Sequence, residues 1–217
     1  MPVSGFGSCW AAGSLSPITL SVCAGFVQSR NPETPGVGRL TGTPKHRRTA
    51  MKNIEVRQVT QNDALFLQQL MNHTEMMAIL HVFPTSVDYW ADAILIWDND
   101  PDEEDYIILD EGVPVGWLGI NGLSSESKQA WVKVIALLPT HQGRGIAHYV
   151  MSEIIENLAL RGFRSVALNT DRSNERAQRC YSRCGFEISK KTVREMPNGT
   201  TVDQYKMERT LGMATDR

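Results

Sequence analysis

The segment 128–160 constrains the fold of this chain more strongly than any other part of the sequence. Residues 128–138 form a run that is nearly all apolar at its end and is stopped by Pro139, as expected of a buried strand. Gly143 and Gly145 follow, and a helix is expected from there to about residue 160. That helix has a single apolar stripe, formed by Ile146, Val150, Ile154 and Leu158. The segment therefore predicts a strand, a tight glycine loop and a helix that packs on the sheet.

The glycine loop has the chemistry of an anion site. The first turn of a helix exposes backbone N–H groups without partners, and their dipoles add up to a partial positive charge. Gly143 and Gly145 allow a bulky anion to approach the backbone closely, and Arg144 adds charge. This predicts a phosphate or pyrophosphate site, although glycines at a helix start also serve close packing. The spacing matches neither the Gly-x-x-x-x-Gly-Lys loop nor the three-glycine dinucleotide fingerprint.

Other apolar runs and turn signals predict the remaining elements. Thr60 and Asp63 resemble the start of a helix, and Thr85 or Ser86 is expected to cap another. The acidic run 98–105 is expected to be a solvated loop. Strands are expected near 54–59, 106–109, 113–120 and 166–168 and on both sides of 197–200, and helices near 65–70, 87–97 and 174–184. The order is a strand, two helices, three strands, a helix, a strand, a helix and two strands, which indicates an α+β fold.

Residues 1–50 differ in composition from the rest of the chain. They are rich in Ser, Gly, Thr and Pro, and carry five basic residues against Glu33 alone, a net charge of +4. We expect 1–50 to be a disordered or dispensable extension and 51–217 to be the functional domain. An organelle transit peptide, or an upstream extension that ends before Met51, stays open. A secretory signal is not favoured, because no basic residue precedes the mildly apolar stretch 18–27.

Composition excludes several classes of protein. No run of about 18 apolar residues is present, so no membrane span is expected. Residues 51–217 carry a net charge of −6, which argues against nucleic acid as a partner and fits a cationic one. The four cysteines have no zinc-type spacing, and we expect no metal. Cys180 and Cys184 are expected to be small core residues in a reducing, cytoplasmic protein.

Two linked motifs resemble the GNAT superfamily of N-acetyltransferases. Residues 142–147, Gln-Gly-Arg-Gly-Ile-Ala, fit its Gln/Arg-x-x-Gly-x-Gly/Ala pattern. Asn174, Ala177, Tyr181 and the pair Gly185-Phe186 reproduce its Asn-x-x-Ala-x-x-x-Tyr-x-x-x-Gly-Phe signature. The resemblance covers about residues 54–211. It implies an α+β fold with a twisted, mostly antiparallel sheet of about seven strands, splayed at a coenzyme slot and flanked by about four helices.

The resemblance also implies the coenzyme-binding residues. Acetyl-CoA would be held by the backbone amides of Gln142, Gly143, Arg144, Gly145, Ile146 and Ala147. Leu137 and Leu138 would lie beside the pantetheine arm, and the amide of Leu137 would polarise the thioester carbonyl. Asn174 would cap its helix and also contact the pantetheine, and Ala177 would be small so that the coenzyme can pass.

The resemblance implies direct attack of an amine on acetyl-CoA, with Tyr181 as the general acid that protonates the leaving thiolate. Many members have a glutamate base on the strand before the loop, but residues 130–136 contain no acid. The base is therefore unassigned. Several side chains are candidates, although each also fits a surface role: His73, Glu75, His81, Asp105 and Glu126. His141 is expected to be a solvated loop residue.

The acceptor is not identified by the sequence. The resemblance places its pocket between residues 70–97 and 195–203, and a small-molecule amine and a protein amine are both compatible with it. A protein Nα-acetyltransferase of the ribosomal type is one alternative. A non-catalytic acyl-CoA-binding or sensing module is another, and a homodimer is compatible with either.

Overall fold

The strands of the computed structural model form one mixed sheet. The structure describes residues 53–196 and 200–212, and the predicted extension 1–50 and the expected Asn-Gly turn lie outside them. In this described part, seven strands are ordered β1-β2-β3-β4-β5-β7-β6. Their bounds are β1 Ile54–Gln58, β2 Glu104–Asp110, β3 Val113–Asn121, β4 Gln129–Leu137, β5 Ser165–Asp171, β6 Glu187–Glu195 and β7 Thr201–Thr210. β4 and β5 are parallel, and the other neighbours in this sheet are antiparallel, which confirms the predicted architecture.

The described residues form five helices rather than the expected four or so. They are α1 Ala64–Met71, α2 Thr74–Leu80, α3 Val87–Trp97, α4 Ile146–Leu160 and α5 Glu175–Arg183. The predicted capping of the first helical segment is present, since the Asp63 carboxylate accepts hydrogen bonds from the backbone N–H and hydroxyl of Thr60. Ser86 Oγ likewise accepts from Tyr89 N and caps α3. The helix α2 was not predicted from the sequence, because it has only seven residues and is capped by His73, which is not a usual capping residue.

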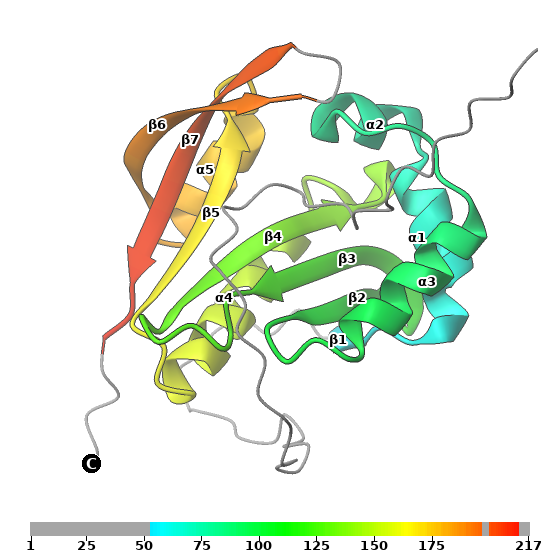
Figure 1. Ribbon diagram of the computed structural model, residues 1–217, viewed down its shortest axis with the longest axis horizontal. Coiled ribbons are helices and arrows are strands. Elements are labelled where there is room, and N and C mark those ends of the chain that lie inside the picture. The colour runs from blue at the N-terminus through cyan, green and yellow to red at the C-terminus, as the bar shows by residue number, and fades with distance from the viewer. Residues whose placement is uncertain (1–52, 197–199, 213–217) are drawn as a thin grey trace, which may run out of the picture.

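The helices cover both faces of the sheet (Figure 1). One apolar core lies under α4 and includes Val150, Ile154 and Leu158 of its predicted stripe. The second core lies under α1, α2 and α3 and includes Trp90 and Trp117. In the first core the strand residues include Leu118 and Val132; in the second they include Ile107 and Ala136. The sheet therefore separates two cores, and residues at both ends of the segment 128–160 are buried in the first of them.

The expectation of a solvated acidic loop was wrong at its end. Glu104 and Asp105 belong to β2, and Asp105 is buried. Its carboxylate lies 3.0 Å from Lys133 Nζ and accepts a hydrogen bond of 2.8 Å from Trp117 Nε1. Lys133 also pairs with Glu103 at 2.9 Å. The charge pattern did not reveal this arrangement, because the cation that allows an acid to be buried comes from β4, far away in the sequence.

β4 and β5 separate along their length. They pair from Gln129–Ser165 to Val132–Leu168, and no pairing continues beyond that point. The register between β3 and β4 shifts at the same level, because Gly119 pairs with Val134 and Ile120 with Val132. Lys133 is therefore the extra residue of a β-bulge, which bends a strand locally. Figure 1 shows the resulting gap between β4 and β5, which confirms the predicted splay.

Candidate functional site

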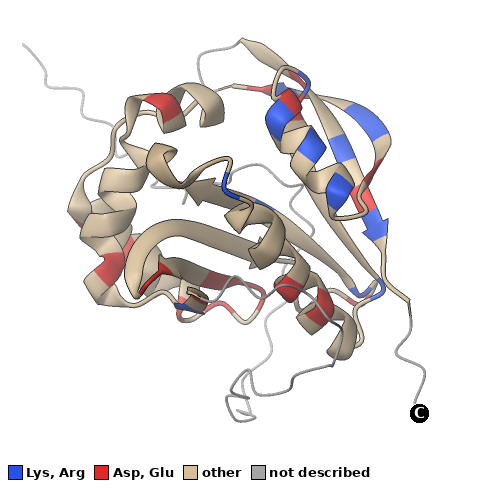
Figure 2. Ribbon diagram, turned by 180° about the vertical axis from the view of Figure 1, so that it is seen from behind, with Lys and Arg blue, Asp and Glu red and all other residues tan. Residues whose placement is uncertain are grey.

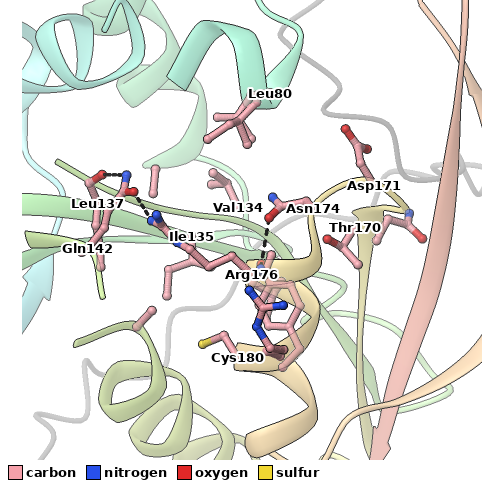
Figure 3. Close-up of a pocket in the computed structure, with 18 of the residues that line it drawn as sticks. Leu80, Val134, Ile135, Leu137, Gln142, Thr170, Asp171, Asn174, Arg176 and Cys180 are labelled. Atoms are coloured by element: carbon pink, nitrogen blue, oxygen red, sulfur yellow. Dashed lines mark hydrogen bonds between the residues drawn. The ribbon is translucent and has the colours of Figure 1, made fainter. Parts of the chain in front are cut away.

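A cavity of about 460 Å³ lies where β4 and β5 separate. Its walls are the C-terminal half of β4, the glycine loop, the end of β5 and one side of α5, and α2 lies over it. Figure 3 shows Leu80 of α2 on one side of this space, Leu137 and Gln142 on another, and Asp171 and Asn174 on a third. Most of the predicted site residues line it: Leu137, Gln142, Gly143, Gly145, Ile146, Ala147, Asn174, Ala177 and Tyr181.

The glycine loop has the geometry that an anion cradle requires. Gly143 and Gly145 have φ values of 74° and 84°, a region that side chains rarely tolerate, and a Cβ at either position would meet no atom within 4 Å. Gly145 is the N-cap of α4, so the N–H groups of the first turn of this 15-residue helix lie at the cavity. Gln142 braces the loop, since its Nε2 donates to Leu137 O at 2.8 Å. These residues fit a diphosphate.

The edge of β4 offers two backbone amides to the gap. Leu138 N donates to Val115 O at 2.8 Å. Hydrogen-bonded and non-bonded pairs alternate along an antiparallel ladder. Because Leu138 and Val115 form a bonded pair, the pairs Leu137–Gly116 and Ile135–Leu118 are non-bonded, and the amides of Leu137 and Ile135 point away from β3. They point toward the gap that β5 leaves open, as the Gln142–Leu137 bond also shows. Ile135 was missed at the sequence level, because the alternation becomes evident only with the register.

Two predicted coenzyme residues lie outside the cavity lining. The amide of Leu138 is already bonded to Val115, so it is not available to a ligand. Arg144 pairs with Asp110 at 3.0 Å, and its guanidinium neutralises a strand-end carboxylate. The backbone of Arg144 stays a predicted part of the loop, but its side chain does not supply the charge that the sequence suggested.

Three arginines of α5 lie at the cavity instead, and one of them, Arg179, is itself paired with Glu175 at 3.1 Å. Arg176, Arg179 and Arg183 all line it, and their spacing of three and four residues places them along one side of the helix. Arg176 Nη2 donates to Gln142 Oε1, which brings this guanidinium to the glycine loop. Figure 2 shows basic residues gathered on α5 and on β6 and β7. The sequence shows the i, i+3, i+7 spacing of these arginines, but it does not show which side of the helix faces the cavity.

The two residues of the second motif lie on α5 as predicted. Asn174 Oδ1 accepts from Ala177 N at 3.1 Å, which is an N-cap, and its side chain also reaches the cavity (Figure 3). Tyr181 lies two turns later, and its ring contacts Phe186 edge-on at 6.1 Å between centroids. Burial, followed by the nearby thiols of Cys180 and Cys184, raises the pKa of Tyr181 above its ordinary value. The phenol therefore stays protonated at neutral pH, as a proton donor must.

The candidate bases named from the sequence lie in different parts of the structure. Glu75 and Glu126 are exposed, and neither lines the cavity. His73 caps α2 through a bond to Glu75 N, and Asp105 is held in the buried pair with Lys133. His81 lines the cavity, with Nε2 2.9 Å from the Asp171 carboxylate. No group of three or more His, Cys, Asp or Glu side chains in residues 53–196 and 200–212 is arranged to hold a metal ion.

Comparison with known proteins places this site in a family. The Acetyltransferase (GNAT) family profile matches residues 69–186, more than half of the chain. N-alpha-acetyltransferase 30 of Schizosaccharomyces pombe is 29% identical over 77 residues, which is 36% of this chain and 51% of that protein. The chain thus matches about half the length of this curated relative.

Solved structures share the fold. Spermidine N-acetyltransferase from Vibrio cholerae, in complex with CoA and spermine, superposes with a TM-score of 0.68 at 21% identity, over 74% of this chain and 97% of that one. The microcin C7 self-immunity acetyltransferase MccE, in complex with acetyl-CoA and AMP, has a TM-score of 0.66 at 18% identity, over 74% and 93%. Because the family match spans more than half of the chain, including both the glycine loop and the α5 motif, this chain belongs to the Acetyltransferase (GNAT) family.

Proposed function

We propose that the cavity between β4 and β5 holds acetyl-CoA and transfers its acetyl group directly to a small primary amine. One observation carries this proposal: the inward-facing amides of Ile135 and Leu137 lie in the same cavity as the cradle formed by Gly143 and Gly145. The cradle and the α4 amides would bind the diphosphate, with charge from the α5 arginines. The pantetheine would then extend along β4 past Asn174 and Ala177.

The chemistry follows from the groups at the end of that path. The amide of Leu137, or that of Ile135, donates to the thioester carbonyl oxygen and stabilises the negative charge that develops there. The amine nitrogen attacks the carbonyl carbon, the C–S bond breaks, and Tyr181 gives its proton to the departing sulfur. Direct attack needs no acyl-enzyme, so Cys180 and Cys184 have no covalent role. They are thiols rather than a disulfide.

The walls of the cavity favour a small acceptor. Met76, Ile79 and Leu80 of α2 contribute an apolar wall, and His81 at the end of this helix is bonded across to Asp171 on β5. That bond joins α2 to β5 across the rim of the cavity. An extended peptide would need an open groove at this place. An apolar wall beside the Asp171 carboxylate fits an alkyl or arylalkyl amine, which is cationic in neutral water.

A panel of acceptors tests this proposal. CoA release is measured with thiol detection for polyamines such as spermidine, for alkyl and aryl amines, and for peptides with free N-termini. We expect release with small amines and none with peptides. Release with peptides alone would instead favour a protein N-terminus as the acceptor, the alternative that the likeness to N-alpha-acetyltransferase 30 supports. Binding of acetyl-CoA without release for any acceptor would favour a sensing module.

The cellular location and the oligomeric state of the enzyme stay predictions. No helix in the described residues is long and apolar enough to cross a membrane. We propose a cytoplasmic location because Cys180 and Cys184 are free thiols, and a homodimer stays compatible with the sequence.

A further inference from the structure

One contact crosses the cavity rim between two elements that are far apart in the sequence. His81 ends α2 in the left-handed conformation, with φ of 53°, and its Nε2 lies 2.9 Å from Asp171 Oδ2 at the end of β5. The second oxygen of Asp171 accepts from Gln204 Nε2 of β7 at 2.8 Å. The Asp171 side chain is 11% exposed and that of His81 is 40% exposed. A fixed, largely buried carboxylate thus holds an imidazole that solvent and ligands can reach.

This pairing determines which imidazole nitrogen can act as a base. A carboxylate only accepts hydrogen bonds, so the neutral imidazole carries its proton on Nε2 and donates it to Asp171. The lone pair is then on Nδ1, which has no hydrogen-bond partner within residues 53–196 and 200–212. Orientation of a histidine by a carboxylate on its far nitrogen is a general way to prepare a base. We propose that His81, oriented by Asp171, is the base that deprotonates the acceptor amine.

The other ionisable groups of the cavity are less suited to this role. They are Lys133, His148, Arg176, Arg179, Cys180, Tyr181, Arg183 and Arg194. The arginines, including Arg194 of β6, stay protonated. Lys133 is paired with Glu103 and Asp105. His148 has a thiol rather than a carboxylate as its partner, since its Nδ1 lies 3.2 Å from Cys184 Sγ. A hydrogen bond with Cys184 lowers the pKa of the Cys180 thiol, which makes its thiolate a weaker base.

The charges around the pair come from several elements. On α2 itself, Glu75 lies at the opposite end, in the first turn. On the loop after β5, Arg172 is paired with Asp203 of β7 at 2.7 Å, so these two charges largely cancel. Arg194 of β6 lines the same cavity. Asp171 is the one carboxylate of the described residues in the cavity lining, and it is the group bonded to the ring, so it orients the imidazole.

The proposed step balances in protons and electrons. The acceptor enters as R–NH₃⁺ and loses one proton to His81 Nδ1, which leaves a neutral amine with a free lone pair. That lone pair forms the C–N bond as the C–S bond breaks, and the thiolate leaves as CoASH with the proton of Tyr181. The second N–H proton restores Tyr181 through solvent, and His81 releases its proton to water. The net reaction converts acetyl-CoA and R–NH₃⁺ to CoASH, R–NH–COCH₃ and H⁺.

This inference rests on acetyl transfer to an amine, and a pair of nucleophiles tests it. One is the best primary alkylamine of the panel, which is cationic at neutral pH. The other is hydroxylamine, which is already uncharged there and needs no base to remove a first proton. We expect H81Q to lower kcat/KM for the primary amine about 100-fold and to abolish the acidic limb of its pH profile. Hydroxylamine-dependent CoA release should fall by less than threefold, and added imidazole should restore part of the amine activity of H81A.

The controls separate a base from a structural role. H73Q changes the histidine at the other end of α2, outside the cavity lining, and should leave both reactions unchanged. D171N should lower activity with the primary amine more than with hydroxylamine. Equal losses with both nucleophiles, or an H81Q enzyme that keeps the acidic limb, would overturn the assignment of His81. Absence of CoA release from the wild-type enzyme with either nucleophile would instead contradict the proposed function itself.

Discussion

At the scale of single residues, the site separates into groups that the sequence could identify and groups that it could not. Asn174 and Tyr181 were predicted through resemblance to a family, and their spacing of seven residues puts them on one face of a helix. Ile135 was not, because strand register decides which amides face the gap. His81 was only one of five candidate bases, because its carboxylate partner comes from β5, far away in the sequence. Asp105 was misassigned for a related reason, since its environment depends on Lys133 of another strand.

Tyr181 can be tested as the general acid. Y181F removes the proton donor but keeps the ring that packs against Phe186, so the helix should stay in place. We expect kcat to fall about 100-fold while the KM for acetyl-CoA changes by less than threefold. Steady-state kinetics across the pH range provide the measurement. An unchanged kcat at all pH values would remove Tyr181 from the mechanism.

The pair formed by Lys133 and Asp105 gives a prediction about stability. The Lys133 side chain is 8% exposed and that of Asp105 is 3% exposed, so K133M leaves a buried carboxylate with less compensation. We expect a loss of about 3 kcal/mol in the free energy of unfolding, measured with urea, and partial recovery in K133M/D105N. R161M, which breaks the more exposed pair with Glu104, should cost less than about 1 kcal/mol.

The pH dependence of that loss follows from the raised pKa of Asp105. Burial raises this pKa to about 6, against the opposing effect of Lys133. The folded state therefore binds the Asp105 proton more tightly than the unfolded state, so the contribution of this group to stability falls as pH rises from about 4 to about 6. K133M removes the opposing cation and raises the pKa further. Its destabilisation should shrink as pH is lowered from 8 to 5, and a constant deficit would contradict this account.

At the scale of elements, local signals predicted most helices and strands. The apolar stripe of α4, the capping pair of Thr60 and Asp63, and the break between the strands near 106–109 and 113–120 were all readable because their causes lie within a few residues. Glu111 and Gly112 both have positive φ, as the tight turn between β2 and β3 requires. The helix α2 was missed because its short apolar run lacks a standard cap and is stabilised by packing on the sheet.

The glycine loop before α4 can be tested against a matched glycine at the other end of the same helix. Gly145 and Gly162 have φ values of 84° and 83°, and a Cβ at either would meet no atom within 4 Å. G145A and G162A should each cost about 1 kcal/mol of stability, because alanine is strained in this region. We expect only G145A to weaken acetyl-CoA binding, by about tenfold or about 1.4 kcal/mol, measured by calorimetry. Equal affinity in the two variants would argue against an anion cradle at Gly145.

At the scale of the whole molecule, the function depends on an arrangement that no single segment encodes. The gap forms because β5 pairs with β4 over four residues and then follows β7, with which it pairs over its full length. The sequence predicted the splay only through resemblance to a family, since the geometry needs the bulge at Lys133 and the course of β5 together. The glycine loop, the β4 edge and α5 then face one cavity, with α2 over it.

Initial-velocity kinetics with both substrates varied test direct transfer within that cavity. Acetyl-CoA and the best amine of the panel must be bound together if the amine attacks the thioester itself. We predict double-reciprocal lines that intersect, with the same pattern in a C180S variant. Parallel lines would show that CoA leaves before the amine binds, as expected of an acyl-enzyme, and would contradict direct transfer in the slot between β4 and β5.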